Sequence, residues 1–255
     1  MGYVRDVVSR VDGTATGGPV VVTIDGAAGA GKSSTAKEVA RRLGFRHLDS
    51  GALYRGVTFA LLADVDGPDE ARPDWGTVTR EQIDALGVHA HWGPRGMEVW
   101  AAGRRLPDEA LRGEAVTAAV SAVSALPPVR EWLMGVQRNA VEAPGLVADG
   151  RDMGTVVFPD ADLKVFLKAD EVVRARRRLI QKGHEHPTAE QVRREASRIA
   201  DRDARDSDRA ISPLQIPERA VVIDTTALDF DEQVSEIVSR TPPAGGSPLP
   251  DSADG

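Results

Sequence analysis

A glycine-rich stretch directly after a run of β-branched residues constrains this chain more than any other part of it. Residues 24–35 read IDGAAGAGKSST and follow the apolar run PVVVT. Gly26, four further residues, and then Gly31, Lys32 and Ser33 satisfy the phosphate-loop pattern. Glycines let consecutive backbone N–H groups curl around an anion, and a helix that follows adds the favourable dipole of its N-terminus. The stretch therefore predicts a site for a nucleoside triphosphate rather than a bare flexible turn.

The residue types within this loop predict how it holds the nucleotide. Lys32 is expected to reach the β- and γ-phosphates, and the Ser33 hydroxyl is placed to bind Mg²⁺ carried by ATP. The predicted ATP-binding residues are Gly26, Ala27, Ala28, Gly29, Ala30, Gly31, Lys32, Ser33 and Ser34.

Composition excludes several classes of protein. The chain has no cysteine, which rules out disulfides and thiolate metal sites, and its formal charge of −7 argues against a dedicated nucleic-acid binder. Residues 1–18 lack the apolar core of a signal peptide, and no apolar run approaches the ~20 residues that span a bilayer. The only asparagine is Asn139, so the guanine-reading Asn-Lys-x-Asp of GTPases is missing. We expect a cytoplasmic, monomeric protein that binds small nucleotides and neither nucleic acid nor membrane.

Strand-like and helical segments alternate along the chain. Short, mostly apolar runs predict strands at residues 20–25, 45–49, 145–150, 162–169 and 219–226. Helical patterns separate them at residues 32–43, 53–62, 129–141, 171–182, 189–205 and 230–239. This alternation implies βαβ crossovers and an α/β fold with a parallel five-stranded sheet flanked by helices.

The remaining segments set the domain boundaries. Residues 64–110 break the α/β rhythm with turns and short strands, which predicts a small, mainly β insertion. We predict one domain at residues 19–240, with a helical lid at about residues 171–209. The polar, glycine- and proline-rich ends predict a disordered extension at residues 1–18 and a disordered tail at residues 241–255.

Charged residues gather where two of the predicted strands end. The stretch VADGRDMGTVVFP delivers Asp149, Arg151 and Asp152 together, and three charges at the end of a buried strand are costly without partners or a ligand. After another strand, HLDSGALYRG offers Asp49, Ser50, Tyr54 and Arg55 at a strand-to-helix junction. Open α/β sheets bind ligands at such junctions, although Tyr54 and Arg55 also suit an ordinary first helical turn.

Arginines with helical spacing mark the C-terminal third, namely Arg174, Arg177, Arg178, Arg202, Arg205 and Arg209. Arg202, Asp206 and Arg209 follow i, i+4, i+7 spacing and share one helix face. Such a run is often only a solvated, salt-bridged face. Beside a phosphate loop it favours mobile cations that close over a transferred phosphoryl group.

Taken together, these segments resemble the bacterial cytidylate kinase family of nucleoside monophosphate kinases. The resemblance rests on TIDGAAGAGKSSTAKEVARRLGF, LDSGALYRG, LVADGRDMGTVVFPDADLKVFLKA, RARRR and RDARDSDRAISPL, and it covers about residues 20–240. It implies a P-loop kinase core with an extra β subdomain. It also implies transfer of the γ-phosphoryl group of ATP to CMP or dCMP, giving ADP and CDP or dCDP.

Roles for individual residues follow from the same resemblance. The catalytic residues would be Lys32, Arg55, Arg151, Arg177, Arg178 and Arg209. The CMP-binding residues would be Ser50, Tyr54, Arg55, Ser121, Arg130, Arg151, Asp152, Arg202, Asp206 and Arg209. Within that set, the cytosine edge is assigned to Ser121, Arg130 and Asp152, and the sugar to Arg202 and Asp206. Cations at the monophosphate are Arg55, Arg151 and Arg209, and the lid over ATP carries Arg177 and Arg178.

The chemistry of cytosine agrees with one of these assignments. Its N4 amino group donates while N3 and O2 accept, so the base suits a carboxylate and a cation together, as Asp152 and Arg130 would provide. Two alternatives stay open from the residues alone. One is a P-loop kinase for a different small acceptor, and the other is a regulatory module that binds ATP without transferring phosphate. The second cluster of arginines argues against the module.

Overall fold

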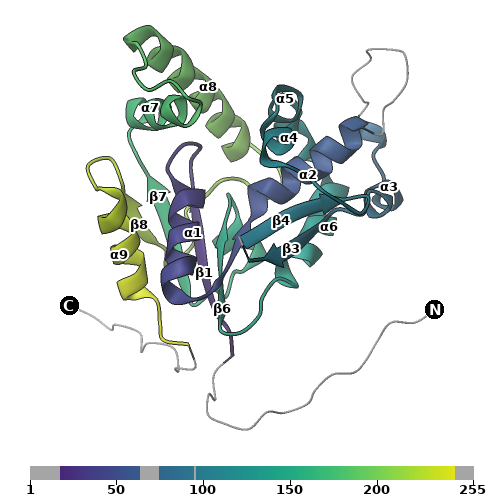
Figure 1. Cartoon of the computed structure of the whole chain (residues 1–255), viewed down its shortest axis with the longest axis horizontal. Coiled ribbons are helices and arrows are strands. Elements are labelled where there is room, and N and C mark those ends of the chain that lie inside the picture. Colours follow the sequence, from purple (N-terminus) through teal and green to yellow (C-terminus); the bar gives the residue numbers. More distant parts are fainter. Residues whose placement is uncertain (1–17, 64–74, 95, 245–255) are drawn as a thin grey trace.

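The computed structural model describes residues 18–63, 75–94 and 96–244 (Figure 1). Its core is a five-stranded sheet in the order β2-β6-β1-β7-β8, and every neighbouring pair is parallel. The strands are β1 (Val20–Gly26), β2 (Arg46–Asp49), β6 (Gly145–Asp149), β7 (Leu163–Lys168) and β8 (Val221–Asp224). The predicted parallel sheet and its five strands are confirmed.

The two faces of β1 explain why the sheet is covered on both sides. Val22 and Ile24 are fully buried in a cluster shared with α1 (Lys32–Leu43) and α9 (Phe230–Arg240). Thr23 and Asp25 point to the opposite face, where β1 contacts the short π-helical turn η2 (Met153–Val157). A strand buried on both faces reads as a continuous run rather than an alternating one.

A second cluster covers the other face and joins the core to the insertion. It includes residues of α2 (Ser50–Ala63), α5 (Glu114–Val123) and α6 (Pro127–Arg138). Gly56 of α2 lies so close to Val99 that a Cβ atom there would meet its side chain at 2.5 Å. The absence of a side chain at Gly56 therefore lets the insertion pack directly against α2.

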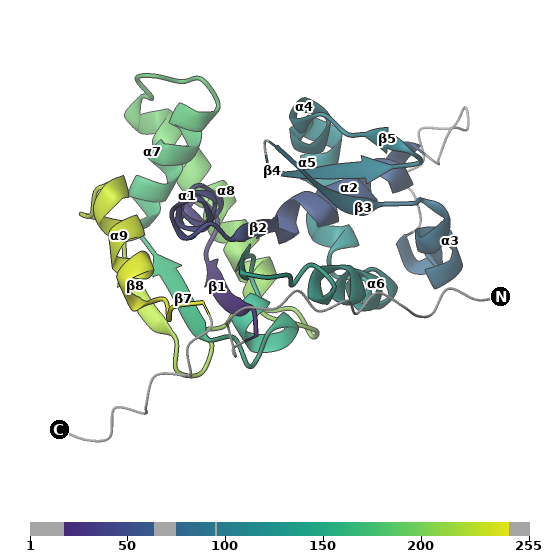
Figure 2. The same cartoon turned by 60° about the horizontal axis from the view of Figure 1, so that its bottom comes forward.

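The insertion forms a separate three-stranded antiparallel sheet, seen beside α2 in Figure 2. Its strands are β3 (His89–Gly93), β4 (Gly96–Ala101) and β5 (Arg104–Arg105). It also holds the short helices η1 (Trp75–Thr77), α3 (Arg80–Ala85) and α4 (Asp108–Arg112), which the sequence prediction of a mainly β insertion lacked. Residues 64–74 and 95 of the predicted insertion lie outside the described residues.

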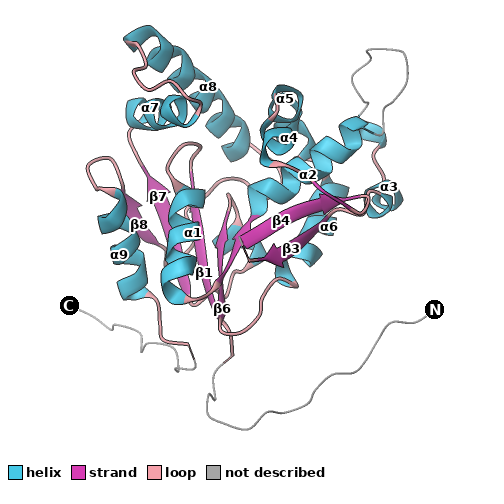
Figure 3. Cartoon of the chain, viewed as in Figure 1, coloured by secondary structure: helices cyan, strands magenta, loops and turns pink. Residues whose placement is uncertain are grey.

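The segment for which we predict a lid contains two helices, α7 (Glu171–Gln181) and α8 (Ala189–Ser207), which we call the lid helices. Their cyan ribbons rise together above the ends of the magenta strands in Figure 3. They pack on each other through a small apolar cluster of Ala175, Leu179, Val192 and Ile199, with Ala28 of the glycine-rich loop as a further member. The lid is thus joined to the loop that follows β1.

The predicted terminal extensions fall almost wholly outside the structure, because residues 1–17 and 245–255 are not described. Among the described ranges, no helix is both long and apolar enough to cross a bilayer.

Candidate active site

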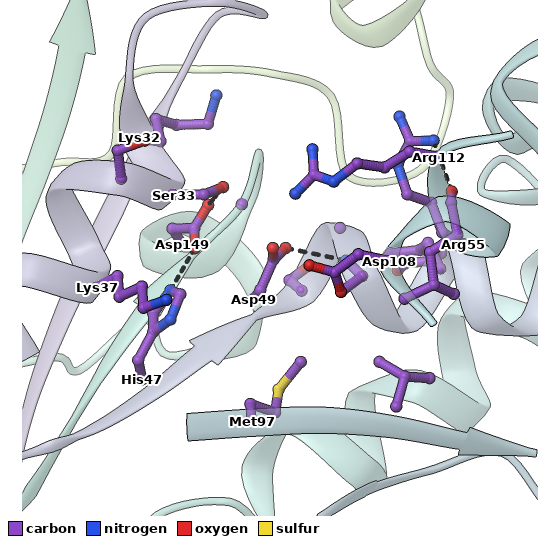
Figure 4. A pocket seen from close by; sticks show the side chains of 18 of the residues that line it. Lys32, Ser33, Lys37, His47, Asp49, Arg55, Met97, Asp108, Arg112 and Asp149 are labelled. Atoms are coloured by element: carbon purple, nitrogen blue, oxygen red, sulfur yellow. Dashed lines mark hydrogen bonds and ion pairs between the residues drawn. The ribbon is translucent and has the colours of Figure 1, made fainter. Parts of the chain in front are cut away.

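A cleft of about 1510 Å³ opens at the carboxyl ends of the parallel strands, between the glycine-rich loop, the lid and the insertion. β1 leads into the loop, and β2 and β6 end side by side at Asp49 and Asp149, which are register partners. Figure 4 shows these two carboxylates facing the cleft, with Lys32 and Ser33 on one side and Arg55 and Arg112 on the other. Because parallel strands all end at this edge, segments far apart in the sequence meet here.

The loop has the backbone shape that a phosphate site needs. Gly26, Gly29 and Gly31 all have positive φ, at 145°, 77° and 90°. At Gly26 a Cβ atom would lie 2.2 Å from the carbonyl oxygen of Leu167, so only glycine fits. Lys32 Nζ donates to the carbonyl oxygen of Ala27 at 2.7 Å. Desolvation and the nearby charge of Arg151 lower the pKa of Lys32 to about 7.

Ser33, Asp149 and His47 form a hydrogen-bonded chain beside the loop. Ser33 Oγ donates to Asp149 Oδ2 at 2.6 Å, and His47 Nε2 lies 2.8 Å from Asp149 Oδ1. Desolvation lowers the pKa of His47, but its bond to Asp149 and the charges of Asp149 and Asp49 outweigh this, so the pKa of His47 is raised overall. A loop hydroxyl and a strand-end carboxylate are the groups that hold Mg²⁺ in P-loop enzymes, and this pair fits that role.

The described residues contain no group of three or more His, Asp or Glu side chains that would hold a metal ion by themselves. A cation at Ser33 and Asp149 would therefore need further oxygen ligands, which nucleotide phosphates and water provide.

Opposite the loop, Arg130 and Asp152 form an ion pair that is almost completely buried. Arg130 Nη1 also donates to the carbonyl oxygen of Ser124 at 2.9 Å, and its guanidinium lies 5.5 Å from the centre of the Tyr54 ring. Within the described residues, Arg130 Nε has no hydrogen-bond partner. The pair lines the cleft and presents a carboxylate and a cation together, as the sequence predicted.

Asp25 holds the turn that carries Asp152. It is fully buried and accepts from the backbone N–H groups of Met153 at 2.9 Å and Gly154 at 2.7 Å. Desolvation raises the pKa of Asp25 to about 6, against the lowering effect of these two bonds. Gly154 is required here, because a Cβ atom would meet Thr23 Oγ1 at 2.8 Å. The β1 strand thus fixes both the glycine-rich loop and the Asp152 turn.

Three arginines gather around the buried carboxylate of Asp206. Arg151 Nε lies 2.8 Å from it, Arg209 Nη2 lies 2.5 Å from it and Arg202 Nε lies 3.9 Å from it. Burial, followed by the charge of Arg151, lowers the pKa of Arg202 to about 9. The helix face predicted for Arg202, Asp206 and Arg209 is only partly present, because α8 ends at Ser207 and Arg209 lies beyond it. Arg209 still pairs with Asp206 from the segment that follows the helix.

Arg55 and Arg178 complete the cations that line the cleft among the predicted set. Arg55 Nη1 donates to the carbonyl oxygen of Leu111 and to Thr117 Oγ1, both at 3.0 Å. Burial and the charges of Arg112 and Arg178 lower the pKa of Arg55. Arg178 Nε pairs with Glu195 at 2.9 Å.

Most of the predicted site residues outside the backbone of the loop line this cleft. They are Lys32, Ser33, Ser34, Ser50, Tyr54, Arg55, Arg130, Arg151, Asp152, Arg178, Arg202, Asp206 and Arg209. Two predicted site residues, Ser121 and Arg177, do not line it. Arg177 instead donates to Thr225 Oγ1 at 3.0 Å and to the carbonyl oxygen of Thr225 at 2.7 Å.

Ser124 lines the wall for which the sequence predicted Ser121. It lies at the end of α5, where its Oγ accepts from Arg209 at 2.9 Å while its carbonyl oxygen accepts from Arg130. Sequence reasoning also gave no role to Asp25 and His47. Asp25 lies within a run that predicts a buried strand. The one signal that could have marked it was its charge within that apolar run.

Comparisons with known proteins show which family the chain resembles. A family model described as cytidylate kinase matches residues 22–242. A cytidylate kinase of Pseudomonas aeruginosa (strain LESB58) is 43% identical over 218 residues, which cover 86% of this chain and 93% of that protein. A cytidylate kinase of Stutzerimonas stutzeri (strain A1501) is 44% identical over 223 residues, covering 86% and 94%.

A solved gluconokinase from Sinorhizobium meliloti 1021 is 16% identical, with a TM-score of 0.38 over 87% of this chain and 91% of that one. A similarity this weak carries no conclusion about the site. The family model and the two sequence relatives, in contrast, each match most of the length. On that basis, the chain belongs to the cytidylate kinase family.

Proposed function

We propose that this protein transfers the γ-phosphoryl group of ATP to CMP or dCMP, giving ADP and CDP or dCDP. The single observation that carries the choice of acceptor is the buried Arg130–Asp152 pair in the wall of the cleft opposite the glycine-rich loop. Family membership supports the reaction type, and the relatives matched above carry the name cytidylate kinase. Residues 19–240 would form the catalytic domain.

Base recognition would use both partners of the pair. Asp152 would accept from the cytosine N4 amino group, while Arg130 would donate to N3 or O2. The carbonyl oxygen of Ser124 holds Arg130, and Asp25 holds the turn that carries Asp152, so the pair would be in place before the base arrives. Preorganised donors and acceptors of this kind cost no rearrangement on binding.

Phosphoryl transfer needs positioning and charge neutralisation more than covalent chemistry. Lys32 would leave the carbonyl oxygen of Ala27 and bind the donor phosphates, with the loop N–H groups around them. Arg55, Arg151 and Arg209 would bind the acceptor phosphate, and Arg178 would approach from the lid. Ser33 and Asp149 would hold Mg²⁺ carried by ATP, which supplies positive charge to the phosphate oxygens.

The proposal also places the enzyme in pyrimidine nucleotide metabolism, with the cytoplasm as its compartment and a monomer as its working unit. Lid closure would exclude water, since an open site would let ATP be hydrolysed instead. Arg202 and Asp206 would meet the sugar on the same closing face.

An assay of ADP release across acceptors tests this function. We expect CMP and dCMP to be phosphorylated far faster than AMP, GMP or TMP at equal concentrations. Equal rates on AMP and CMP would refute the specificity. ADP release that does not depend on any acceptor would refute transfer itself.

A further inference from the structure

Ala28, in the glycine-rich loop, contacts the lid through its backbone N–H, its carbonyl oxygen and its methyl group. Its backbone N–H donates to Asp203 Oδ1 of α8 at 2.8 Å. Its carbonyl oxygen accepts from Arg174 Nη1 of α7 at 2.9 Å. Its methyl group belongs to the apolar cluster of the lid, and the residue is only 3% exposed. Ala28 is thus a member of the lid core as much as of the loop.

Arg174 and Asp203, the two side chains that bind Ala28, also bind each other. Arg174 Nη1 forms an ion pair with Asp203 Oδ2, and Arg174 Nε donates to the carbonyl oxygen of Ala169 at 3.1 Å. Arg174 is 5% exposed, so its charge depends on these partners. We call Arg174, Asp203 and the backbone of Ala28 the lid clasp.

Backbone packing beside the clasp is equally close. Gly29 has φ of 77°, and a Cβ atom there would lie 3.1 Å from the carbonyl oxygen of Arg174 and 3.2 Å from its Cβ atom. A side chain at position 29 would therefore push α7 away from the loop. The loop and the first turn of the lid fit each other along this whole contact.

The clasp lies within one helical turn of cations that line the cleft. Arg178 follows Arg174 by four residues on α7, and Arg202 directly precedes Asp203 on α8. Residues four apart on a helix share a face, so the position of Arg174 also determines the point on α7 from which the Arg178 side chain extends. The same rigid α8 carries Arg202 and Asp206.

We propose that Arg174 and Asp203 are positioning residues, which fix the lid to the glycine-rich loop through Ala28 and thereby align the lid arginines with the donor phosphates. Neither residue need touch a nucleotide. When the lid closes, the clasp would act as its pivot and keep α7 and α8 in register with the loop. This inference rests on the proposed function, because it assigns the clasp to the same transfer reaction.

Substitutions that open the clasp test this role. We expect Asp203→Ala and Arg174→Met to lower kcat by roughly 10- to 100-fold, the range that a small misplacement of catalytic groups costs. CMP affinity measured by calorimetry should fall less than kcat, because Arg202 and Asp206 of α8 are only part of the proposed CMP site, and Arg130 and Asp152 lie on other elements. Asp203→Asn keeps an acceptor for the Ala28 N–H but loses the charge, so its kcat should fall less. The matched control is Arg194→Met, which breaks an exposed pair with Glu190 on the same helix and should leave kcat unchanged.

A double variant separates positioning from plain stability. Arg174→Met combined with Asp203→Leu replaces the buried ion pair with apolar groups, which often restores the stability that single variants lose. We expect the Tm of the double variant to return towards that of the parent while kcat stays low, because the Ala28 backbone still lacks its hydrogen bonds to the lid. Recovery of kcat together with Tm would overturn the proposal, as would parental kcat in the folded single variants.

Hydrogen exchange provides a readout that needs no acceptor. In the clasp variants, amides of α7 and α8 should exchange faster while those of the five-stranded sheet stay as in the parent. Equal protection of the lid in parent and variants would overturn the clasp even if CMP turnover is normal. A parent enzyme that phosphorylates no CMP would instead refute the proposed function, whatever the exchange shows.

Discussion

The two ends of the cleft, to which we assign the phosphoryl donor and the acceptor, differ in how their side chains are held. At the donor end, groups that would meet ATP are occupied by internal partners: Lys32 donates to the Ala27 carbonyl oxygen and Ser33 donates to Asp149. At the acceptor end, Arg130 and Asp152 are held by Ser124 and by the turn that Asp25 anchors. In the proposed reaction, ATP binding would therefore require Lys32 and Ser33 to exchange partners, whereas the Arg130–Asp152 pair would only have to accept the base. On this proposal, positive charge and loop N–H groups would bind ATP, and the Arg130–Asp152 side-chain pair would select the base.

The strongest way to break the donor end is Lys32→Met. Loss of a cation that neutralises charge in the transition state should lower kcat about 100- to 1000-fold. CMP affinity should change little, because the acceptor wall does not depend on this lysine. Steady-state kinetics with CMP calorimetry checks both, with Lys168→Met, an exposed lysine at the end of β7, as the control. A variant with near-parental kcat would mean that the loop is not the donor site.

The acceptor end is broken most directly by Asp152→Asn. Uracil has a carbonyl at position 4 and an N–H at position 3, so it opposes both partners of the pair with the wrong polarity. We expect kcat/KM for CMP to fall roughly 10- to 100-fold, at about 1.4 kcal/mol per tenfold, and that for UMP to fall much less. Asp160→Asn, at an exposed position just beyond η2, is the matched control. Parallel losses for the two acceptors would show that Asp152 braces the turn and does not read the base.

A smaller effect at the donor end is expected from His47. His47→Phe removes the partner of Asp149 Oδ1, whereas His47→Gln can still donate through its own Nε2 group. Loss of a residue that orients a metal ligand costs ~10- to 100-fold in metal affinity, and we expect the low end for the phenylalanine variant. The rate as a function of free Mg²⁺ measures this, with CMP calorimetry as the control. An unchanged Mg²⁺ requirement in both variants would contradict this role.

The smallest predicted effect concerns the pH dependence of stability through Asp25. Because its pKa is raised to about 6 in the folded protein, its contribution to stability is present at low pH and lost as the pH rises through about 6. Asp25→Asn removes this titration. Between pH 5 and pH 7, the unfolding free energy of the parent relative to the variant should fall by about 1 kcal/mol. Urea unfolding at several pH values measures it, and a constant difference would mean that Asp25 is not titrating in this range.

The sequence was most informative where structure is local. The glycine-rich loop, the apolar strand runs and the helical arginine spacing are each contained in a short segment, and the predicted sheet and lid helices are present. Contacts between distant segments were beyond reach. Asp25 bonds to residues 128 and 129 positions away, and Ala28 meets Asp203 across 175 positions. Which serine lines the cleft depended on where α5 ends, because Ser124 directly follows the helix, three positions after Ser121.

Calorimetry of CMP and UMP binding to the enzyme without ATP tests the central comparison most directly. If the Arg130–Asp152 pair is preformed, the parent binds CMP in the absence of any donor and prefers it to UMP by roughly 10-fold or more, as a mismatched base edge of ~1–3 kcal/mol requires. In Asp152→Asn this preference should narrow while Lys32→Met retains it. Equal affinities for CMP and UMP in the parent, or CMP binding that appears only with an ATP analogue, would contradict the account.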